Sequence, residues 1–226
     1  MIQLSNGDFI GISEELVGSD FESGAIFSYD LTNDVLDLRI TTQEFPAGSA
    51  VLGSVVESIN EAHIGITRQG GEFGFGGIFE YQPGQDTIIS RASFGGGNVT
   101  EWLSTGPLSE EINGFHYGLA DIDDSDFDVL YRFDPVNNVL DTVHTFGLNI
   151  TGPGARGSLI HNNGLLYGEV NRGGANGTGG LFAYNIDQDS YELIYSLDNG
   201  IAGSEVTSMV LSGNKLYGTR GSVYFS

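Results

Sequence analysis

Short stretches in which hydrophobic and polar residues alternate recur along the whole chain. Val35 to Thr41 and Thr87 to Phe94 are two of them, and both are rich in β-branched side chains. A period of two places successive side chains on opposite faces, which is typical of a β-strand with one face buried. No stretch shows the three-to-four-residue apolar spacing of an amphipathic helix. The pattern therefore predicts an all-β protein.

These strand-like stretches repeat along the chain. An apolar residue followed by glycine marks each unit, and the glycines are 50 to 54 residues apart, at Gly11, Gly65, Gly118, Gly168 and Gly218. An alternating aromatic stretch follows each glycine, as in Ile26-Phe27-Ser28-Tyr29 and Leu181-Phe182-Ala183-Tyr184. A turn rich in Asn, Asp and Gly comes next, which favours a hairpin.

Four short strands in a unit of this length match the blade of a β-propeller. We expect one propeller domain over residues 1–226, with five four-stranded blades of which one is incomplete. The alternative is a segment of a larger propeller. The expected units are residues 6–59, 60–112, 113–162 and 163–213, with 214–226 and 1–5 forming part of a fifth.

Within each unit, the glycine-bearing strand is expected to come first. The glycines are expected at equivalent places around one axis, where converging blades leave little room for side chains. The fourth strand of each complete unit is expected near its end, at residues 53–59, 107–112, 158–161 and 208–211.

Two glycine-rich segments resemble a known repeat. Residues 70–79 read Gly-Gly-Glu-Phe-Gly-Phe-Gly-Gly-Ile-Phe, residues 173–182 keep the same glycine spacing, and Leu216-Tyr217-Gly218-Thr219 adds a third match. In these features nearly the whole chain resembles the GloVer repeats of bacterial surface and secreted proteins. The resemblance implies a propeller-like fold and an extracellular or cell-surface location, but no defined chemistry. The third unit departs from it, because aspartates replace its glycines.

The charge excludes some partners. Thirty acidic residues oppose eight basic ones, which gives a formal charge of −22. Such a surface repels nucleic-acid phosphates and anionic lipids. No apolar run approaches the roughly 20 residues that span a bilayer. The chain has no cysteine, so disulfides and thiolate metal sites are excluded.

An acidic stretch in the third unit is a candidate calcium site. Its carboxylates come from one predicted hairpin loop, at Asp121, Asp123, Asp124, Asp126 and Asp128. Calcium prefers several carboxylate oxygens supplied by one flexible loop. The glycine and glutamate of an EF-hand loop are missing. The alternative is a solvated acidic loop in a protein without a cofactor.

Three aromatic residues are candidate ligand contacts. Trp102 is the only tryptophan and lies in an irregular insertion, residues 95–105, that no other unit has. Phe73 and Phe75 lie in the first glycine-rich segment. An exposed aromatic side chain on a loop can stack on a sugar or anchor a protein partner. The alternative is that these rings cover the edge of a blade.

Two histidines occupy equivalent positions, two residues before the marker glycine. They are His63 and His116, and the other units have Phe9, Leu166 and Leu216 there. Because three equivalents are apolar, we expect packed histidines with satisfied ring nitrogens. The alternative is a two-histidine metal site, but no third ligand recurs nearby.

Together these features predict a non-enzymatic extracellular binding or adhesion module that recognises glycans or a surface protein. No residue is assigned a catalytic role, and no nucleophile-elbow motif is present. One alternative is a glycan hydrolase or lyase with carboxylates near the axis, for which Asp8, Asp121 and Glu169 are candidates. Another is a structural subunit whose incomplete end strands contact neighbouring chains.

Overall fold

The computed structural model describes residues 2–3, 7–13, 24–41, 49–95, 102–122, 127–147, 154–175, 177–197 and 205–221. Apart from one 3-10 turn at Ile59–Glu61, the regular elements of this part of the chain are β-strands. Among these residues, no helix is long and apolar enough to cross a membrane. The all-β prediction is confirmed.

The strands form four four-stranded antiparallel sheets and one two-stranded sheet. The first sheet consists of β1 (Ile2–Gln3), β2 (Phe9–Ser13), β3 (Ala25–Asp30) and β4 (Val35–Thr41). The second consists of β5 (Ser49–Glu57), β6 (His63–Gln69), β7 (Gly77–Gln82) and β8 (Thr87–Ser93). The third consists of β9 (Trp102–Ser104), β10 (His116–Ile122), β11 (Asp128–Asp134) and β12 (Val139–Phe146). The fourth consists of β13 (Ala155–Asn162), β14 (Leu165–Val170), β15 (Gly180–Asn185) and β16 (Ser190–Ser196), and the fifth of β17 (Glu205–Ser212) and β18 (Lys215–Gly221).

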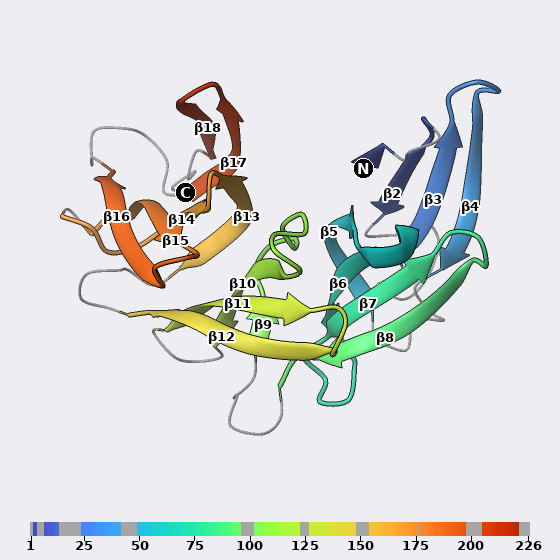
Figure 1. The fold of residues 1–226 in the computed structure, drawn as a ribbon, viewed down its shortest axis with the longest axis horizontal. Helices are drawn as coiled ribbons and strands as arrows, with labels where there is room; N and C mark the ends of the chain where they lie inside the picture. The colour runs from blue at the N-terminus through green and yellow to red at the C-terminus, as the bar shows by residue number, and fades with distance from the viewer. Residues whose placement is uncertain are drawn as a thin grey trace, which may run out of the picture.

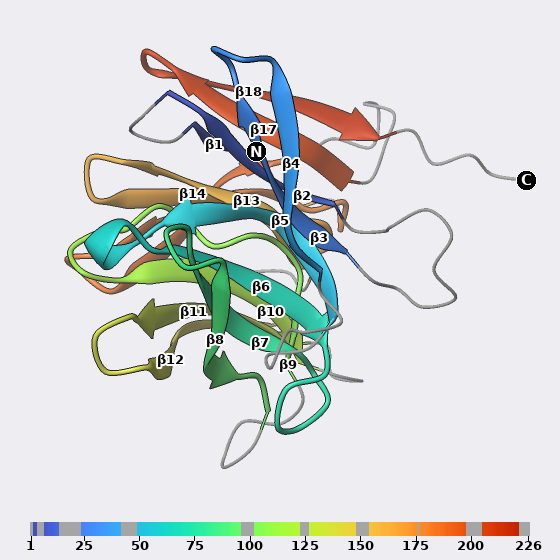
Figure 2. The same cartoon turned by 90° about the vertical axis from the view of Figure 1, so that its right-hand side faces the viewer.

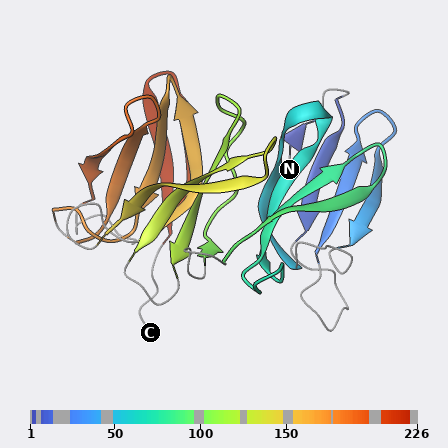
Figure 3. The same ribbon diagram turned by 60° about the horizontal axis from the view of Figure 1, so that its bottom comes forward.

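The sheets follow one another in chain order along an open arc (Figure 1). In Figure 1 the first sheet, in blue, and the two-stranded sheet, in red, lie at the two ends of this series. Figure 3 shows the first and second sheets on one side of the molecule and the remaining sheets on the other. In Figure 2 the strands β5, β13 and β17 run across the picture, so that strand ends form two opposite rims. This arrangement of blade-like sheets is that of a β-propeller, as predicted.

The sheets are offset by one strand from the units expected from the sequence. β5, at the end of the expected first unit, pairs with β6 of the next unit. Likewise β1 pairs with β2, and β18 pairs with β17, so the two chain ends complete different sheets. A tandem repeat has no unique starting point in the sequence, and only strand pairing fixes where a sheet begins.

One expected strand is wrong. Residues 107–112 do not form a strand, and the inner strand of the third sheet is instead β9. After β9 the chain continues beside β10 with widely spaced backbone hydrogen bonds. The Thr105 amide donates to the Leu119 carbonyl at 3.0 Å, and the Ser109 amide donates to the Tyr117 carbonyl at 2.8 Å. Pro107 lies between these two residues and has no N–H to donate, so a regular ladder is interrupted there.

In the four four-stranded sheets the marker glycine lies on the second strand, directly opposite an aromatic residue on the third strand. Gly118 pairs with Tyr131, and Gly168 pairs with Phe182. A Cβ atom added to Gly118 would lie 2.4 Å from the Cζ atom of Tyr131. Gly11 and Gly65 have the same relation to Phe27 and Phe79. The glycine is therefore required because an aromatic ring lies across it, and not because the blades converge there.

Each sheet has two unlike faces. The front face carries the marker glycine and the aromatic rings, and in the second to fourth sheets it packs on the preceding sheet. The back face of the first sheet carries aliphatic side chains, among them Ile10 and Ile26, and packs on the next sheet. The first interface, for example, buries Ile10 and Ile26 of the first sheet against Phe79 and Tyr81 of the second. The core is therefore a series of layers, one between each pair of sheets.

Candidate functional site

The predicted site residues that the structure describes, Phe73, Phe75, Trp102, Asp121 and Asp128, lie toward one rim of the molecule. In an antiparallel sheet successive connections alternate between the two ends of the strands. The short turns after β3, β7, β11 and β15 define one end, which we call the turn rim. The opposite end, the loop rim, includes residues 70–76, the adjoining ends of β10 and β11, and the start of β9. The loop rim is the candidate functional site.

The glycine-rich loop at residues 70–76 presents one phenylalanine and packs the other. The Gly76 amide donates to the Gly70 carbonyl at 2.8 Å, and Gly70, Gly71, Gly74 and Gly76 all have positive φ angles. The Phe73 side chain is 44% exposed. Phe75 is partly buried and packs on the cluster between the second and third sheets. The loop thus holds an exposed ring on a fixed support.

Trp102 lies in a strand and not in an irregular insertion. It is the first residue of β9, the inner strand of the third sheet, where it pairs with Ile122. In the same sheet Leu103 pairs with Asp121, which pairs with Asp128 on β11. The predicted aromatic and acidic positions, which are separate in the sequence, therefore adjoin at one end of the third sheet.

Asp128 has a structural role that the sequence did not indicate. Its side chain is buried, and one carboxylate oxygen accepts hydrogen bonds from the Gly154 amide and, at 3.2 Å, the Ala155 amide. The carboxylate thus joins the third sheet to the start of β13. Burial raises the pKa of this carboxyl group, although the two amide bonds oppose that shift.

The calcium site stays a prediction. Asp123, Asp124 and Asp126 lie outside the described residues. Asp121 and Asp128 pair across β10 and β11, but Asp128 already accepts two backbone amides. Within the described ranges no group of three or more His, Asp or Glu side chains could hold a metal ion.

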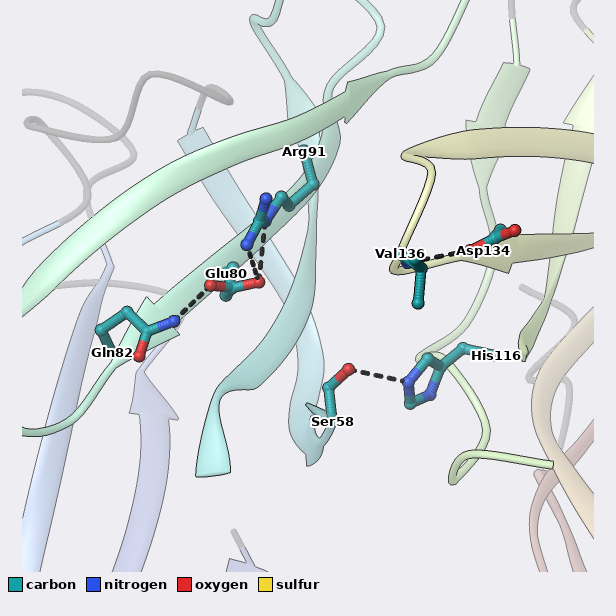
Figure 4. Close-up of polar contacts among 7 residues, drawn as sticks. All are labelled: Ser58, Glu80, Gln82, Arg91, His116, Asp134 and Val136. Carbon is teal, nitrogen blue, oxygen red and sulfur yellow. Dashed lines mark hydrogen bonds and ion pairs between the residues drawn. The ribbon is translucent and has the colours of Figure 1, made fainter. Parts of the chain in front are cut away.

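The two equivalent histidines differ in their bonding. In His116, which is buried, Nδ1 lies 2.9 Å from the Ser109 carbonyl oxygen and Nε2 lies 3.2 Å from the Ser58 hydroxyl oxygen (Figure 4). The prediction of a packed histidine with satisfied nitrogens is confirmed for His116. His63 is also buried, but its Nδ1 has no hydrogen-bond partner within the described part of the chain.

We expect the His63→Leu variant to be more stable than the parent chain, and less sensitive to acid. Burial lowers the pKa of His63 below its ordinary value. The unfolded chain therefore binds the proton more readily, and stability is lost as the pH falls through about 6.5. Leucine occupies the equivalent, fully buried position 166. Removing an unpaired buried nitrogen should contribute about 1 kcal/mol at neutral pH and more below it.

Thermal unfolding between neutral and mildly acidic pH measures this effect. The His116→Leu variant is the control, because it leaves the Ser58 and Ser109 oxygens without their partner and should gain less. A His63→Leu variant that is less stable than the parent at every pH would contradict the prediction.

An ion pair within the second sheet, between its third and fourth strands, has a buried carboxylate and was not predicted from the sequence. The Glu80 side chain on β7 is 2% exposed, and its Oε2 atom lies 2.5 Å from Arg91 Nη2 and 2.7 Å from Arg91 Nε. Gln82 donates to the other carboxylate oxygen (Figure 4). The signal that could have found it is Arg91, which recurs as Arg39 in the first unit.

The structure does not bring the three axial candidates onto one sheet. Asp8 precedes β2 of the first sheet, Asp121 ends β10 of the third, and Glu169 lies on β14 of the fourth. Glu169 is buried.

Among the solved structures that are similar to this chain are three whose scores illustrate the likeness. The extracellular domain of BT4673 from B. thetaiotaomicron has a TM-score of 0.57 at 12% identity, over 87% of this chain and 24% of that one. An oligogalacturonate lyase in complex with manganese has 0.53 at 10% identity, over 76% and 42%. TolB from Acinetobacter baumannii has 0.52 at 13% identity, over 89% and 47%. The chain spans less than half of each, and such identities show a shared propeller-type fold alone.

The sequence of this chain matches a family of repeats. The family model described as the Gloeobacter/Verrucomicrobia repeat matches residues 1–223. No curated protein sequence matches the chain. The family match covers almost the whole sequence and agrees with the resemblance to GloVer repeats.

Proposed function

Because this chain belongs to the Gloeobacter/Verrucomicrobia repeat family, we propose that it is an extracellular module that binds glycans at its loop rim. A similar propeller-type structure is an extracellular domain, and another belongs to an enzyme named for a sugar polymer. These likenesses support the proposal as analogies between folds. The proposed role is binding and adhesion without catalysis.

The observation that carries the proposal is the exposed Phe73 ring on its hydrogen-bonded loop. Both phenylalanines adjoin Gly95, since a Cβ atom there would lie 2.9 Å from Phe75 Cδ2 and 3.1 Å from Phe73 Cβ. Phe75 therefore supports the loop from below, and Phe73 offers its ring to solvent. A flat apolar ring held in this way can stack on the face of a sugar.

The negative charge of the protein favours neutral glycans over anionic ones. A formal charge of −22 repels uronic acids and sulfated sugars. We therefore expect neutral polysaccharides to bind, with xylan or chitin as probes and polygalacturonate as the anionic contrast. If calcium binds near Asp121, it would lower this repulsion, and binding of polygalacturonate would then depend on added calcium.

We expect Phe73→Ala to abolish retention on a neutral polysaccharide in affinity electrophoresis, with thermal stability nearly unchanged. Phe75→Ala is the matched control from the same loop. It should lower stability, because it opens a gap in a packed cluster. The Trp102→Ala variant should behave like Phe73→Ala if this tryptophan shares the site. Equal retention of the parent and Phe73→Ala proteins would reject the proposal.

A second candidate role, assembly with further copies of the same chain, rests on the two end faces of the arc. On the front face of the first sheet, Leu36 is 65% exposed and Leu38 is 61% exposed. Ile88 of the second sheet is equivalent to Leu36, and Leu193 of the fourth sheet is equivalent to Leu38. Both pack on core clusters, because their sheets have a preceding neighbour. The first sheet therefore has an apolar front face with no sheet against it in the described chain.

The back face of the two-stranded sheet is the second exposed end face, and it could pack on the front face of another copy's first sheet. Tyr217 is 54% exposed and Val210 is 60% exposed, whereas the equivalents of Tyr217 at Ile10, Ile64 and Tyr117 are buried. Every interface inside the chain pairs a back face with a front face. The back face of one copy can therefore receive the front face of another, which is a head-to-tail contact.

We expect sedimentation to show concentration-dependent association that strengthens as salt screens the negative charge. Leu38→Glu should reduce this association. Val136→Glu is the control, because Val136 is an exposed apolar residue on the turn rim, away from both end faces. A single monomeric species at all concentrations, or an equal effect of the two variants, would contradict the assembly.

A further inference from the structure

A polar cavity of about 230 Å³ lies between the back face of the third sheet and the front face of the fourth. It is close to the turn rim and so lies away from the loop rim. Its lining combines a guanidinium group, a carboxylate, two phenols and a small apolar floor: Tyr117, Arg132, Thr142, Val143, Tyr184, Ile186 and Asp189.

The repeat explains why this cavity exists. Each four-stranded sheet has a bulge between its third and fourth strands, and the extra residue is Arg39, Arg91, Val143 or Ile194. At the first interface Arg39 Nε donates to Ser28 Oγ at 2.7 Å, and its Nη1 lies 3.7 Å from Asp86 Oδ2 of the next sheet. At the second interface Arg91 binds Glu80.

At the third interface the bulge residue is valine, which is much shorter than arginine. Val143 lines the cavity. Arg132, from the neighbouring strand, also lines it, and its side chain is hydrogen-bonded to that of Tyr117. Its Nε and Nη2 atoms lie 3.2 Å from Asp141 Oδ2, and its guanidinium carbon lies 4.5 Å from the centre of the Phe115 ring. The space that an arginine fills elsewhere is thus left open.

The carboxylate that pairs with Arg39 at the first interface has an equivalent at the third interface. Asp86 accepts the Tyr81 hydroxyl at 2.5 Å, and Asp189 accepts the Tyr184 hydroxyl at 2.5 Å, so the two turns are equivalent. Asp86 also has Arg39 as an ionic partner. Among the described residues, no ion pair includes Asp189.

We propose that this cavity binds a guanidinium group of an external organic cation, either a small molecule or an arginine side chain of a peptide. The ligand would take the place that Arg39 fills at the first interface. Asp189 would supply a charge-assisted hydrogen bond, and the rings of Tyr117 and Tyr184 would supply faces for a cation. The strong negative charge of the molecule would attract the ligand.

Calorimetric titration with agmatine tests the proposal, with glucose and glucuronate as neutral and anionic contrasts. We expect saturable binding of agmatine alone among these three. Asp189→Asn should weaken binding by about tenfold or more, because a hydrogen bond to a charged group is lost. Val143→Arg should abolish binding, because it introduces the arginine that occupies this bulge in the first and second sheets. A tripeptide amide, Gly-Arg-Gly, distinguishes the sources, since it binds only if the cavity admits a peptide side chain.

Asp86→Asn is the matched control, and it should leave agmatine binding unchanged because Arg39 already occupies that turn. Phe73→Ala should also leave it unchanged, which separates this site from the proposed glycan site. Absence of saturable agmatine binding, tighter binding of glucuronate, or full binding by a folded Asp189→Asn variant would overturn the proposal.

Discussion

Replacing Phe182 with alanine is expected to lower the free energy of unfolding by about 3 to 5 kcal/mol. Phe182 is fully buried at the interface of the third and fourth sheets. Its ring centre lies 5.2 Å from that of Phe146 and 5.6 Å from that of Tyr191. The same ring covers Gly168, so the substitution leaves a cavity in this packed cluster.

Phe27→Ala is the matched control, because Phe27 occupies the same repeat position opposite Gly11. Phe27 is only partly buried, since no sheet of the described chain lies against the front face of the first sheet. We expect its cost to be roughly half that of Phe182→Ala, or less. Chemical denaturation of both variants measures the difference. Equal losses would mean that the front face of the first sheet is covered in solution.

Replacing Arg91 with alanine is expected to cost about 3 to 5 kcal/mol, because it leaves the Glu80 carboxylate buried without its cation. Glu80 is 2% exposed, and among the side chains that the structure describes it would retain the Gln82 amide as its donor. The loss arises from the unpaired charge and not from the missing attraction as such. A double variant with methionine at both positions should therefore recover most of the stability.

Arg39→Ala is the control for this prediction. Arg39 occupies the equivalent bulge, but its pair with Asp86 spans 3.7 Å and both side chains are more than one-third exposed. Exposed pairs of this kind contribute roughly 0 to 1 kcal/mol. Urea unfolding at neutral pH would compare the two. Similar costs for Arg39→Ala and Arg91→Ala would show that Glu80 does not depend on its cation.

The local features of the fold were predictable because they depend on neighbouring residues in the chain. The alternation in Val35 to Thr41 and in the aromatic stretches predicted strands, and the Asn- and Asp-rich turns predicted hairpins. The spacing of the marker glycines predicted the repeat, because the glycine of each four-stranded sheet lies opposite one aromatic ring. The same spacing also marked His116 as a packed residue, because equivalent positions are apolar.

Features that depend on contacts between sheets were decided only by the tertiary structure. Strand pairing fixed the start of each sheet, placed Trp102 on β9, and excluded a regular strand at residues 107–112. Because the third sheet packs on the fourth, Asp128, which the sequence indicated as a candidate calcium ligand, accepts hydrogen bonds from two backbone amides. The cavity beside Val143 exists only because a short side chain faces the Asp189 turn of another sheet. Sequence periodicity determines which face of its own strand a side chain occupies, whereas the partner on that face comes from a distant part of the chain.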